Sequence, residues 1–328
     1  METEIKTKPL IVEIDPRDIF VLILKAENVN YETDICGRTL VQWAEDAASG
    51  FAYRKVEIQK NDDIITIVKN TVIDKKYCVV IYADTPLLTR NTLEQAISFV
   101  ASYGHKAAAM PRGWVFETEF VKKSLNIETV DIPNLDQDDF LVAYSLAQIA
   151  LISTYQRGRI NEKHLNNGIH IADPYNVYID ADVTIGKGTR VGPGVVLRGE
   201  CKIGKNCRIT NFVEIKKSII GDGTKIAHMS YVGDAVVGRN CNIGCGVVFC
   251  NYDGRKKNPI TVGDGVFIGS NSNLIAPLTL ADNAYIAAGS TITQDVPTDS
   301  LGIARARQAI KEGWRLLSQS ESKQTDNN

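Results

Sequence analysis

The chain has 328 residues, enough for two domains, and its formal net charge of -2 argues against nucleic acid or an anionic membrane as the main partner. No apolar run approaches the roughly 18 residues of a membrane-spanning helix, and the polar N-terminus lacks the apolar segment of a secretory signal. Seven cysteines show no CxxC spacing, so we expect reduced thiols in a cytoplasmic protein.

Apolar runs and helical spacing alternate in the first half of the chain. Residues 19–24 and 78–83 are unbroken apolar runs, which are typical of strands buried on both faces of a sheet. Residues 39–49 have helical spacing and stop at Gly50, and residues 91–103 predict a second helix capped by Asn91 or Thr92. Strand alternating with helix predicts a three-layer α/β domain.

Asp84 directly follows the second predicted strand. Sheets of this kind place ligands at the carboxyl ends of their strands, so Asp84 is a candidate ligand for a divalent metal held against a nucleotide phosphate. The alternative is that its side chain caps the turn before Pro86, and the sequence does not separate the two.

Residues 138–167 return to a helical pattern. We expect a connecting helix, a kink near Gly158 and a second short helix ending at Gly168, with His164 as a solvated helix residue. The polar tail beyond Trp314 predicts disorder.

From Ile179 to about Thr293, apolar residues return with a period of six. Two steps of five residues and one gap of thirteen interrupt the period, which fits neither a helix nor an alternating strand. A six-residue period is the signature of a parallel β-helix, in which each short strand sends one aliphatic side chain inward before a corner. Three hexapeptides make one coil, and stacked coils bury a continuous aliphatic column.

The interruptions of this repeat are candidates for function, because a solenoid packs best when it is regular. The short steps lie over residues 216–218 and 233–235, and the long gap contains a loop at 250–259. Polar side chains gather at or next to these places: Arg198, Glu214, Lys216, His228, Tyr231, Asn242 and Asn251. They combine cations for an anion, a histidine base, and amide and hydroxyl donors. Taken singly, His228 could equally be a solvated coil residue, and solvated surface is the default for Lys216 and Lys217.

Specific motifs extend this pattern over half of the chain. They are RINEKHLNNG (159–168), NFVEIKKS (211–218), AHMSYVGDA (227–235), NIGCG (242–246), CNYDG (250–254), FIGSNSNLIAPLTL (267–280), AYIAAGSTIT (284–293) and ARARQ (304–308). With these motifs the chain resembles, from about residue 157 to 311, the C-terminal domain of the bifunctional N-acetylglucosamine-1-phosphate uridyltransferase / glucosamine-1-phosphate N-acetyltransferase family. The resemblance implies a left-handed parallel β-helix, a homotrimer, and a role in making UDP-N-acetylglucosamine, a peptidoglycan precursor. The implied reaction moves acetyl from acetyl-CoA to the amine of glucosamine 1-phosphate.

The resemblance also implies roles for individual residues. His228 matches the family's base, with Glu214 as an orienting or sugar-binding carboxylate. The sugar-phosphate contacts match Arg198, Lys216, Tyr231 and Asn242, and Lys257 matches a loop lysine that reaches a neighbouring subunit's site. The coenzyme contacts match Cys245, Asn251, Tyr252, Ser270, Ala288 and Arg305. The family often has Ala where this chain has Cys245, a change that a backbone contact would tolerate.

The chemistry of these residue types agrees with acetyl transfer. A thioester needs a neutral amine as its nucleophile, and an imidazole can take the proton of an aminosugar near neutral pH. Arg198 and Lys216 could hold the phosphate, and backbone N–H groups or Asn251 could stabilise the tetrahedral oxyanion. Two alternatives remain open: another amino-sugar phosphate as the acceptor, and a non-catalytic trimer that binds a sugar nucleotide.

The front domain resembles the family's nucleotidyltransferase domain in residues 21–24, 36–47 and 83–89. The glycine-rich loop that should follow the first strand is absent, since residues 25–32 contain neither glycine nor arginine. Without those glycines, backbone N–H groups cannot cradle a triphosphate. We therefore expect uridyl transfer to be lost, and Mg²⁺ to matter only if this domain still binds a nucleotide.

The predicted domain organisation has five parts. They are a degenerate nucleotidyltransferase-like α/β domain (1–137), connecting helices (138–168), the left-handed β-helix acyltransferase domain (169–300), a C-terminal extension (301–318) and a disordered tail (319–328).

Overall fold

The structure is a computed structural model that describes residues 14–71 and 74–314. It divides into two compact units, Met1–Lys202 and Ile203–Asn328. The disorder predicted beyond Trp314, with the tail 319–328, and the N-terminal residues without a secretory signal lie outside the described residues. Among the described helices, none combines the length and the apolar character that a membrane crossing requires.

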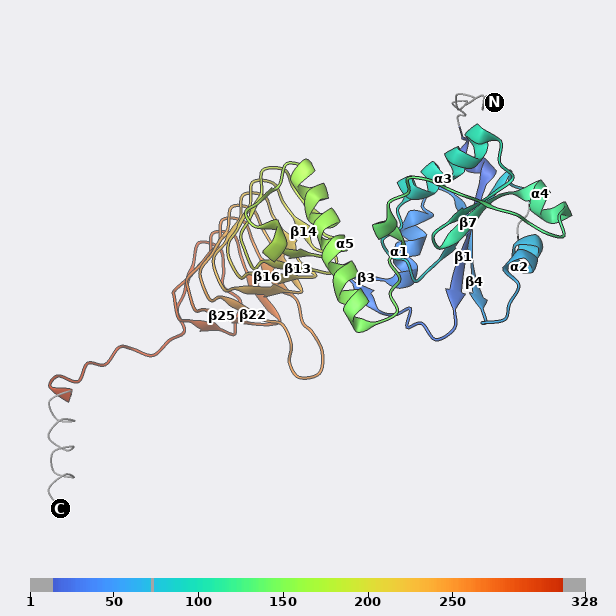
Figure 1. Cartoon of the computed structure of the whole chain (residues 1–328). Coiled ribbons are helices and arrows are strands. Elements are labelled where there is room, and N and C mark those ends of the chain that lie inside the picture. Colours follow the sequence, from blue (N-terminus) through green and yellow to red (C-terminus); the bar gives the residue numbers. More distant parts are fainter. Residues whose placement is uncertain (1–13, 72–73, 315–328) are drawn as a thin grey trace, which may run out of the picture. The chain divides into compact units, whose positions relative to one another are not determined.

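The first unit opens with a six-stranded mixed sheet in the order β4-β1-β5-β7-β6-β8 (Figure 1). Its strands are β1 (Ile19–Ala26), β4 (Ala52–Ile58), β5 (Tyr77–Tyr82), β6 (Ala107–Met110), β7 (Gly113–Glu117) and β8 (Val130–Asp131). Strand β1 runs parallel to β4 and β5, whereas β7 is antiparallel to β5 and β6. The helices are α1 (Leu40–Ala47), α2 (Ile64–Thr71), α3 (Arg90–Tyr103) and α4 (Thr118–Lys123). Strands β2 (Asp34–Ile35) and β3 (Arg38–Thr39) form a separate hairpin.

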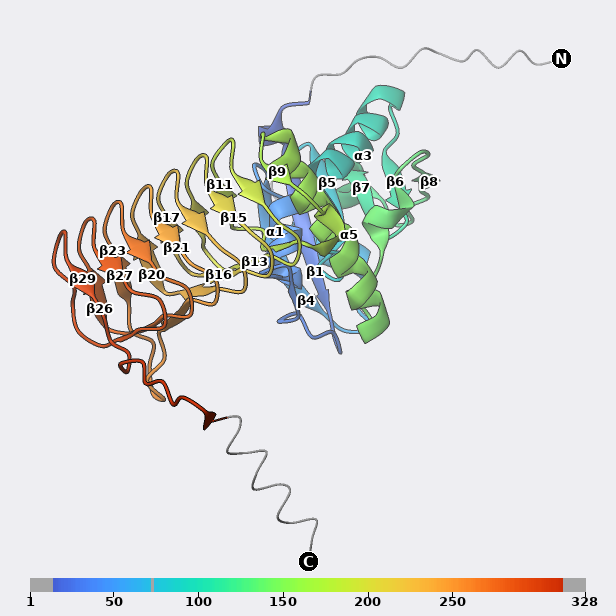
Figure 2. The ribbon, with the colours of Figure 1, turned by 90° about the vertical axis from the view of Figure 1, so that its left-hand side faces the viewer.

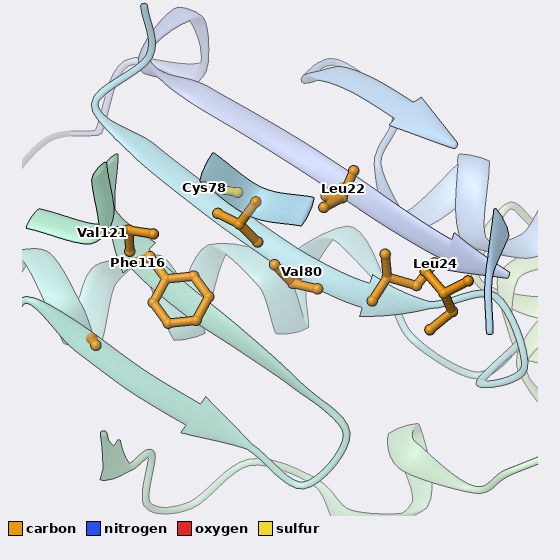
Figure 3. Packing of buried hydrophobic residues seen from close by; sticks show 9 residues of the cluster. Leu22, Leu24, Cys78, Val80, Phe116 and Val121 are labelled. Atoms are coloured by element: carbon orange, nitrogen blue, oxygen red, sulfur yellow. The ribbon is translucent and has the colours of Figure 1, made fainter. Parts of the chain in front are cut away.

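Both faces of this sheet are buried, as the unbroken apolar runs predicted. On one face, Leu22, Leu24, Val80 and Phe116 pack with Val121 of α4 in a single hydrophobic cluster (Figure 3). The alternate residues of the central strands, among them Val21, Ile23, Val79 and Ile81, are equally buried on the other face. Because successive side chains of a strand point to opposite faces, helices must cover both. The three-layer α/β prediction is confirmed.

The helix caps differ in part from the prediction. Helix α3 begins at Arg90, and its N-cap is Thr89, whose hydroxyl accepts a hydrogen bond from the Thr92 amide at 3.1 Å. The expected caps, Asn91 and Thr92, lie inside the first turn instead. A threonine hydroxyl can accept a hydrogen bond from a free backbone N–H of the first turn only if the threonine precedes the helix, as Thr89 does.

The connecting region holds one continuous helix, α5 (Leu146–Asn166), so the predicted pair of helices is wrong. The helix starts at the N-cap Ser145, later than expected, because residues 137–140 form the short 3-10 helix η2 (Gln137–Phe140). Gly158 lies inside α5 and does not break it; glycine weakens a helix interior by only about 1 kcal/mol relative to alanine. Gly168, at φ 83°, follows the helix end as predicted.

His164 is buried rather than solvated, with 7% of its surface exposed. Burial, and secondarily the charge of Lys163, lowers the pKa of its imidazole. The error arose because helical spacing reveals which residues share a face and not what covers that face.

The first unit continues into short parallel strands. These are β9 (His170–Ile171), β10 (Tyr178–Ile179), β11 (Thr184–Ile185), β12 (Arg190–Val191), β13 (Val196–Arg198) and β14 (Lys202–Ile203), with the 3-10 helix η3 (Pro174–Asn176) among them. Strand β10 pairs with β13, and β12 with β9. Helix α5 is fixed to these turns by Asn161, whose amide donates to the carbonyls of Pro174 and Val177 at 2.7 and 3.0 Å.

The second unit is a stack of short strands in three parallel sheets (Figure 2). One sheet contains β16 (Glu214–Lys216), β19 (Tyr231–Gly233), β22 (Val248–Cys250), β25 (Asn273–Ile275) and β28 (Thr291–Ile292). The second contains β17 (Ile219–Ile220), β20 (Ala235–Val237), β23 (Ile260–Val262) and β26 (Leu278–Leu280). The third contains β15 (Arg208–Ile209), β18 (Lys225–Ile226), β21 (Asn242–Ile243), β24 (Phe267–Ile268), β27 (Tyr285–Ile286) and β29 (Leu301–Gly302). Strands that follow one another in the chain belong to different sheets, which is the arrangement of a left-handed parallel β-helix.

The inward aliphatic column agrees with the six-residue period. Of the nineteen apolar positions that the period selects, only Ile185 is not fully buried. At both five-residue steps a residue other than glycine adopts a left-handed backbone, namely Lys217 (φ 46°) and Asp234 (φ 49°). The loop predicted within residues 250–259 leaves the coil between β22 and β23 (Figure 1).

Candidate active site

Three of the predicted site residues lie on neighbouring strands of one sheet in the second unit. Glu214 and Lys216 flank the inward Ile215 on β16, so both point outward. In the parallel register Glu214 is opposite Tyr231 and Lys216 is opposite Gly233. Adjacent strands are about 4.8 Å apart, and the carboxylate, the ammonium and the phenol therefore share one outer surface.

Asn251 and Tyr231 meet over Gly233. The Asn251 amide nitrogen lies 3.4 Å from the Tyr231 hydroxyl and 2.5 Å from a carboxylate oxygen of Asp234. A Cβ at position 233 would lie 2.3 Å from the tyrosine hydroxyl oxygen, so a side chain there would displace Tyr231 from this position. Both N–H groups of the Asn251 amide have partners within the protein, and the oxyanion role of Asn251 stays a prediction.

The loop at 250–259 is folded back on itself by Asp253. Its carboxylate accepts hydrogen bonds from the backbone amides of Arg255 and Lys256 and from the Asn258 side chain, each at 2.8 Å. These bonds, led by that of Lys256, lower the pKa of Asp253 to about 2. Tyr252 pairs with Lys257 across the loop, and the tyrosine ring is exposed.

The Lys257 ammonium lies 3.7 Å from Asp234 of its own chain. Asp234 thus contacts both the loop and Asn251, although it was not among the predicted site residues. The signal that could have found it was present, since Asp234 lies in the second five-residue step.

His228 stands in a column of equivalent corner positions from successive coils. The Gly246 amide donates to the His228 carbonyl, the Asn271 amide to that of Cys245, and the Gly289 amide to that of Ser270, at 3.0, 2.8 and 2.8 Å. Because each donor immediately follows a corner residue of the next coil, the column runs in one order: His228, Cys245, Ser270, Ala288. It therefore joins the candidate base to three residues predicted to contact the coenzyme.

The column is closely packed at its far end. A Cβ on Gly269 would lie 2.4 Å from the Ala288 backbone nitrogen, so the coils can approach this closely only with glycine at position 269. The Arg305 guanidinium donates to the Ala288 carbonyl at 3.1 Å. Arg305 is itself exposed, and this hydrogen bond holds its guanidinium next to the column.

The His228 ring has one neighbour that was not predicted. Its Nδ1 lies 3.4 Å from the Thr210 hydroxyl, which lies 3.3 Å from the Ile226 carbonyl. If the hydroxyl donates to that carbonyl, its oxygen is free to accept from a protonated Nδ1, leaving Nε2 as the acceptor nitrogen. The ring is exposed, so Nε2 can be reached from solvent.

Two further predicted residues, Asn242 and Arg198, lie on other strands. Asn242 lies on β21, in the third sheet, where its backbone pairs with Lys225 and Phe267. In the described part of the chain, its side chain makes no hydrogen bond to the other predicted residues. Arg198 ends β13 in the first unit and is exposed.

The Asp84 side chain pairs with an arginine, which was not among its predicted partners. It directly follows β5, as predicted, but Arg112 donates two hydrogen bonds to its two carboxylate oxygens, at 2.8 and 2.5 Å. The carboxylate is buried, and its side chain does not cap the turn before Pro86. Among the described residues no group of three His, Cys, Asp or Glu could hold a metal ion. Asp84 as a metal ligand stays a prediction.

The fold and its outward polar residues define a hexapeptide-repeat parallel β-helix protein with a fused α/β domain. Residues 174–296 match the family model described as "GMPPB C-terminal domain". The Bifunctional protein GlmU of Acetivibrio thermocellus is 43% identical over 230 residues, covering 55% of this chain and 50% of that protein. The protein of the same name from Clostridium perfringens (strain SM101 / Type A) is 41% identical and covers 55% and 51%.

The chain spans about half the length of the curated relatives it matches. The resemblance read from the motifs is confirmed over that part of the chain. Among solved structures, UDP-N-acetylglucosamine acyltransferase from Campylobacter jejuni is 14% identical, with a TM-score of 0.34, covering 42% of this chain and 68% of that one.

Proposed function

We propose that this protein is an N-acetyltransferase that moves acetyl from acetyl-CoA to the amine of glucosamine 1-phosphate. The observation that carries the proposal is the corner column, in which His228 precedes Cys245, Ser270 and Ala288 on successive coils. A coenzyme arm lying along this column would bring its thioester to the histidine. The similarity to the GlmU proteins over 55% of the chain supports the same assignment.

In the proposed reaction, His228 Nε2 takes a proton from the amine as the nitrogen attacks the thioester carbonyl. The C–N bond forms, the C–S bond breaks through a tetrahedral intermediate, and the thiolate leaves and regains a proton. Lys216 holds the phosphate, and Glu214, opposite Tyr231 in the adjacent strand, orients the sugar. Thr210 fixes the histidine tautomer that makes Nε2 the base.

We further propose that uridyl transfer is lost, that Mg²⁺ has no part in the acetyl transfer, and that the enzyme is a cytoplasmic homotrimer. The Arg112 guanidinium on both oxygens of Asp84 supports the first point, because a metal ion would have to displace it. The loop after β1 supports it too, since it contains no glycine for binding phosphates.

A coupled assay tests these assignments. Purified full-length protein is mixed with acetyl-CoA and glucosamine 1-phosphate, and thiol release is followed with and without UTP and magnesium. We expect steady turnover in all conditions, about 1–10³ per second, and no formation of UDP-N-acetylglucosamine. Absence of thiol release with this acceptor, but release with another amino-sugar phosphate, would change the substrate and keep the chemistry.

A further inference from the structure

The first unit contains a cavity of about 460 Å³ that none of the candidate active-site residues lines. It lies among α1, the start of α3, α5 and the strand β11, all within residues 38–185. Helix α5 and its C-cap contribute a stripe of lining residues: Gln156, Arg159, Ile160, Lys163, His164 and the C-cap Asn167. Their spacing of three to four residues places them on one face of the helix.

The cavity has an apolar wall. Trp43, Leu88, Ile160 and Val183 line it together with Ile185. Ile185 is the one position of the inward aliphatic column that is not fully buried. Displacement of water from such a wall by an apolar group is favourable.

Two polar groups of α5 at this cavity lack partners. Gln156 is 6% exposed, and its Oε1 is shut off from solvent without a hydrogen bond. Within the described residues its Nε2 has no partner either, and a half-turn of the amide exchanges the two atoms. The His164 ring also makes no hydrogen bond there, and its lowered pKa favours the neutral ring, with one donor and one acceptor nitrogen. An unpaired buried amide destabilises the folded chain, so a ligand that pairs with it is favoured.

The charges at the cavity favour an anion. Three arginines line it, and each already has a carboxylate partner: Arg38 with Asp46 and Asp182, Arg90 with Glu94, and Arg159 with Asp139. Lys163 is exposed and makes no ion pair among the described residues. The one lining carboxylate, Asp46, is occupied by Arg38. An unpaired ammonium thus remains at the cavity.

We propose that this cavity is a binding site for a nucleoside monophosphate or a closely similar phosphorylated ring compound. The ring would cover the wall of Leu88 and Ile160, hydroxyl groups would pair with Gln156 and His164, and the phosphate would bind Lys163. A hydroxyl can donate and accept, so it satisfies the amide in either orientation. The volume is in the range of about 300–1,000 Å³ that small-molecule sites occupy.

Calorimetric titration of the full-length protein with UMP and AMP, without acetyl-CoA, tests the inference. We expect at least one of them to bind, with the matching nucleoside and inorganic phosphate each about tenfold weaker or worse. Lys163→Gln should weaken binding by about tenfold or more, since it removes the only unpaired charge at the site. Lys60→Gln, an exposed lysine of the same unit outside the cavity, is the matched control and should bind normally.

A second variant separates loss of binding from loss of folding. Gln156→Leu should also weaken binding, yet it should leave the ligand-free melting temperature unchanged or raised, because it removes an unpaired buried amide. Arg112→Gln tests a second place, the carboxylate of Asp84 that follows β5: if it alters binding while Lys163→Gln does not, the nucleotide binds beside Asp84 and the inference fails. It fails equally if neither nucleotide binds up to about 5 mM. Binding is measured without acetyl transfer, so loss of the proposed function would leave this result standing.

Discussion

At the scale of single residues, the proposed mechanism assigns His228 to chemistry and Lys216 to binding. His228→Ala should lower kcat by roughly 10²–10⁴-fold with little change in KM, because a general base acts in the transition state. Lys216→Ala should mainly raise KM, because a phosphate contact is made in both ground and transition states. Steady-state kinetics of both variants separate the two roles. Near-normal kcat in His228→Ala would leave Glu214, or the amine's own deprotonation, to account for the reaction.

Thr210 is a positioning residue in the same mechanism. Thr210→Val removes the hydroxyl that lies 3.4 Å from His228 Nδ1 but keeps the shape of the side chain. We expect kcat to fall by about tenfold, less than the roughly 10²–10⁴-fold expected for loss of the base itself, while KM stays the same and Thr210→Ser restores most of the rate. A purely structural role would not be reversed by the hydroxyl alone, so rescue by Thr210→Ser separates the two. Normal kcat in Thr210→Val, or no recovery in Thr210→Ser, would show that the hydroxyl does not position the ring.

At the scale of elements, helix α5 makes the stability of the first unit depend on pH. The buried His164 has a pKa below that of an unfolded histidine, about 6.5. Below that pH the unfolded chain binds a proton that the folded chain takes up less readily, so the free energy of unfolding decreases as the pH falls from about 6.5. Above it, the neutral ring carries no such penalty.

The prediction is that His164→Gln loses less stability than the wild type between pH 7.5 and pH 5.5, around the histidine pKa of about 6.5. Melting temperatures at the two pH values give the comparison, and His170→Gln, which changes an exposed histidine, is the control. Equal pH dependence in wild type and His164→Gln would contradict the role of His164.

The elements also show where sequence reasoning succeeds. The β-helix was predictable because each strand needs one inward aliphatic residue, and these residues therefore recur with a fixed period along the chain. The irregular steps of that period also led to Glu214, Lys216 and Tyr231, which the structure places on β16 and β19, while their functional roles stay predictions. What could not be read were contacts between distant positions, such as Arg112 with Asp84, and the burial of His164 on α5. Both depend on tertiary packing, which the local spacing of residues does not reveal.

At the scale of the whole molecule, the proposed trimer needs an interface. The second sheet of the second unit offers one, because Ile219 and Val236 are opposite each other on β17 and β20 and remain 46% and 49% exposed. Neighbouring exposed aliphatic residues on a regular strand surface are typical of surfaces that other chains cover. The cation of the protruding loop, Lys257, has only a 3.7 Å contact with Asp234 inside its own chain, and it is 43% exposed. It is therefore free to reach a neighbouring subunit.

We expect light scattering coupled to size-exclusion chromatography to give three times the mass of the chain for the wild type. Ile219→Asp combined with Val236→Asp should yield monomers, because a carboxylate buried at an interface without a partner costs several kcal/mol. Thr291→Asp, an exposed position on the first sheet, is the matched control and should remain trimeric. A trimer that survives both aspartates places the interface elsewhere, and a monomeric wild type removes the trimer altogether. If Lys257 acts across that interface, the monomeric variant should lose acetyl transfer even though His228, Lys216 and the corner column are intact within each chain.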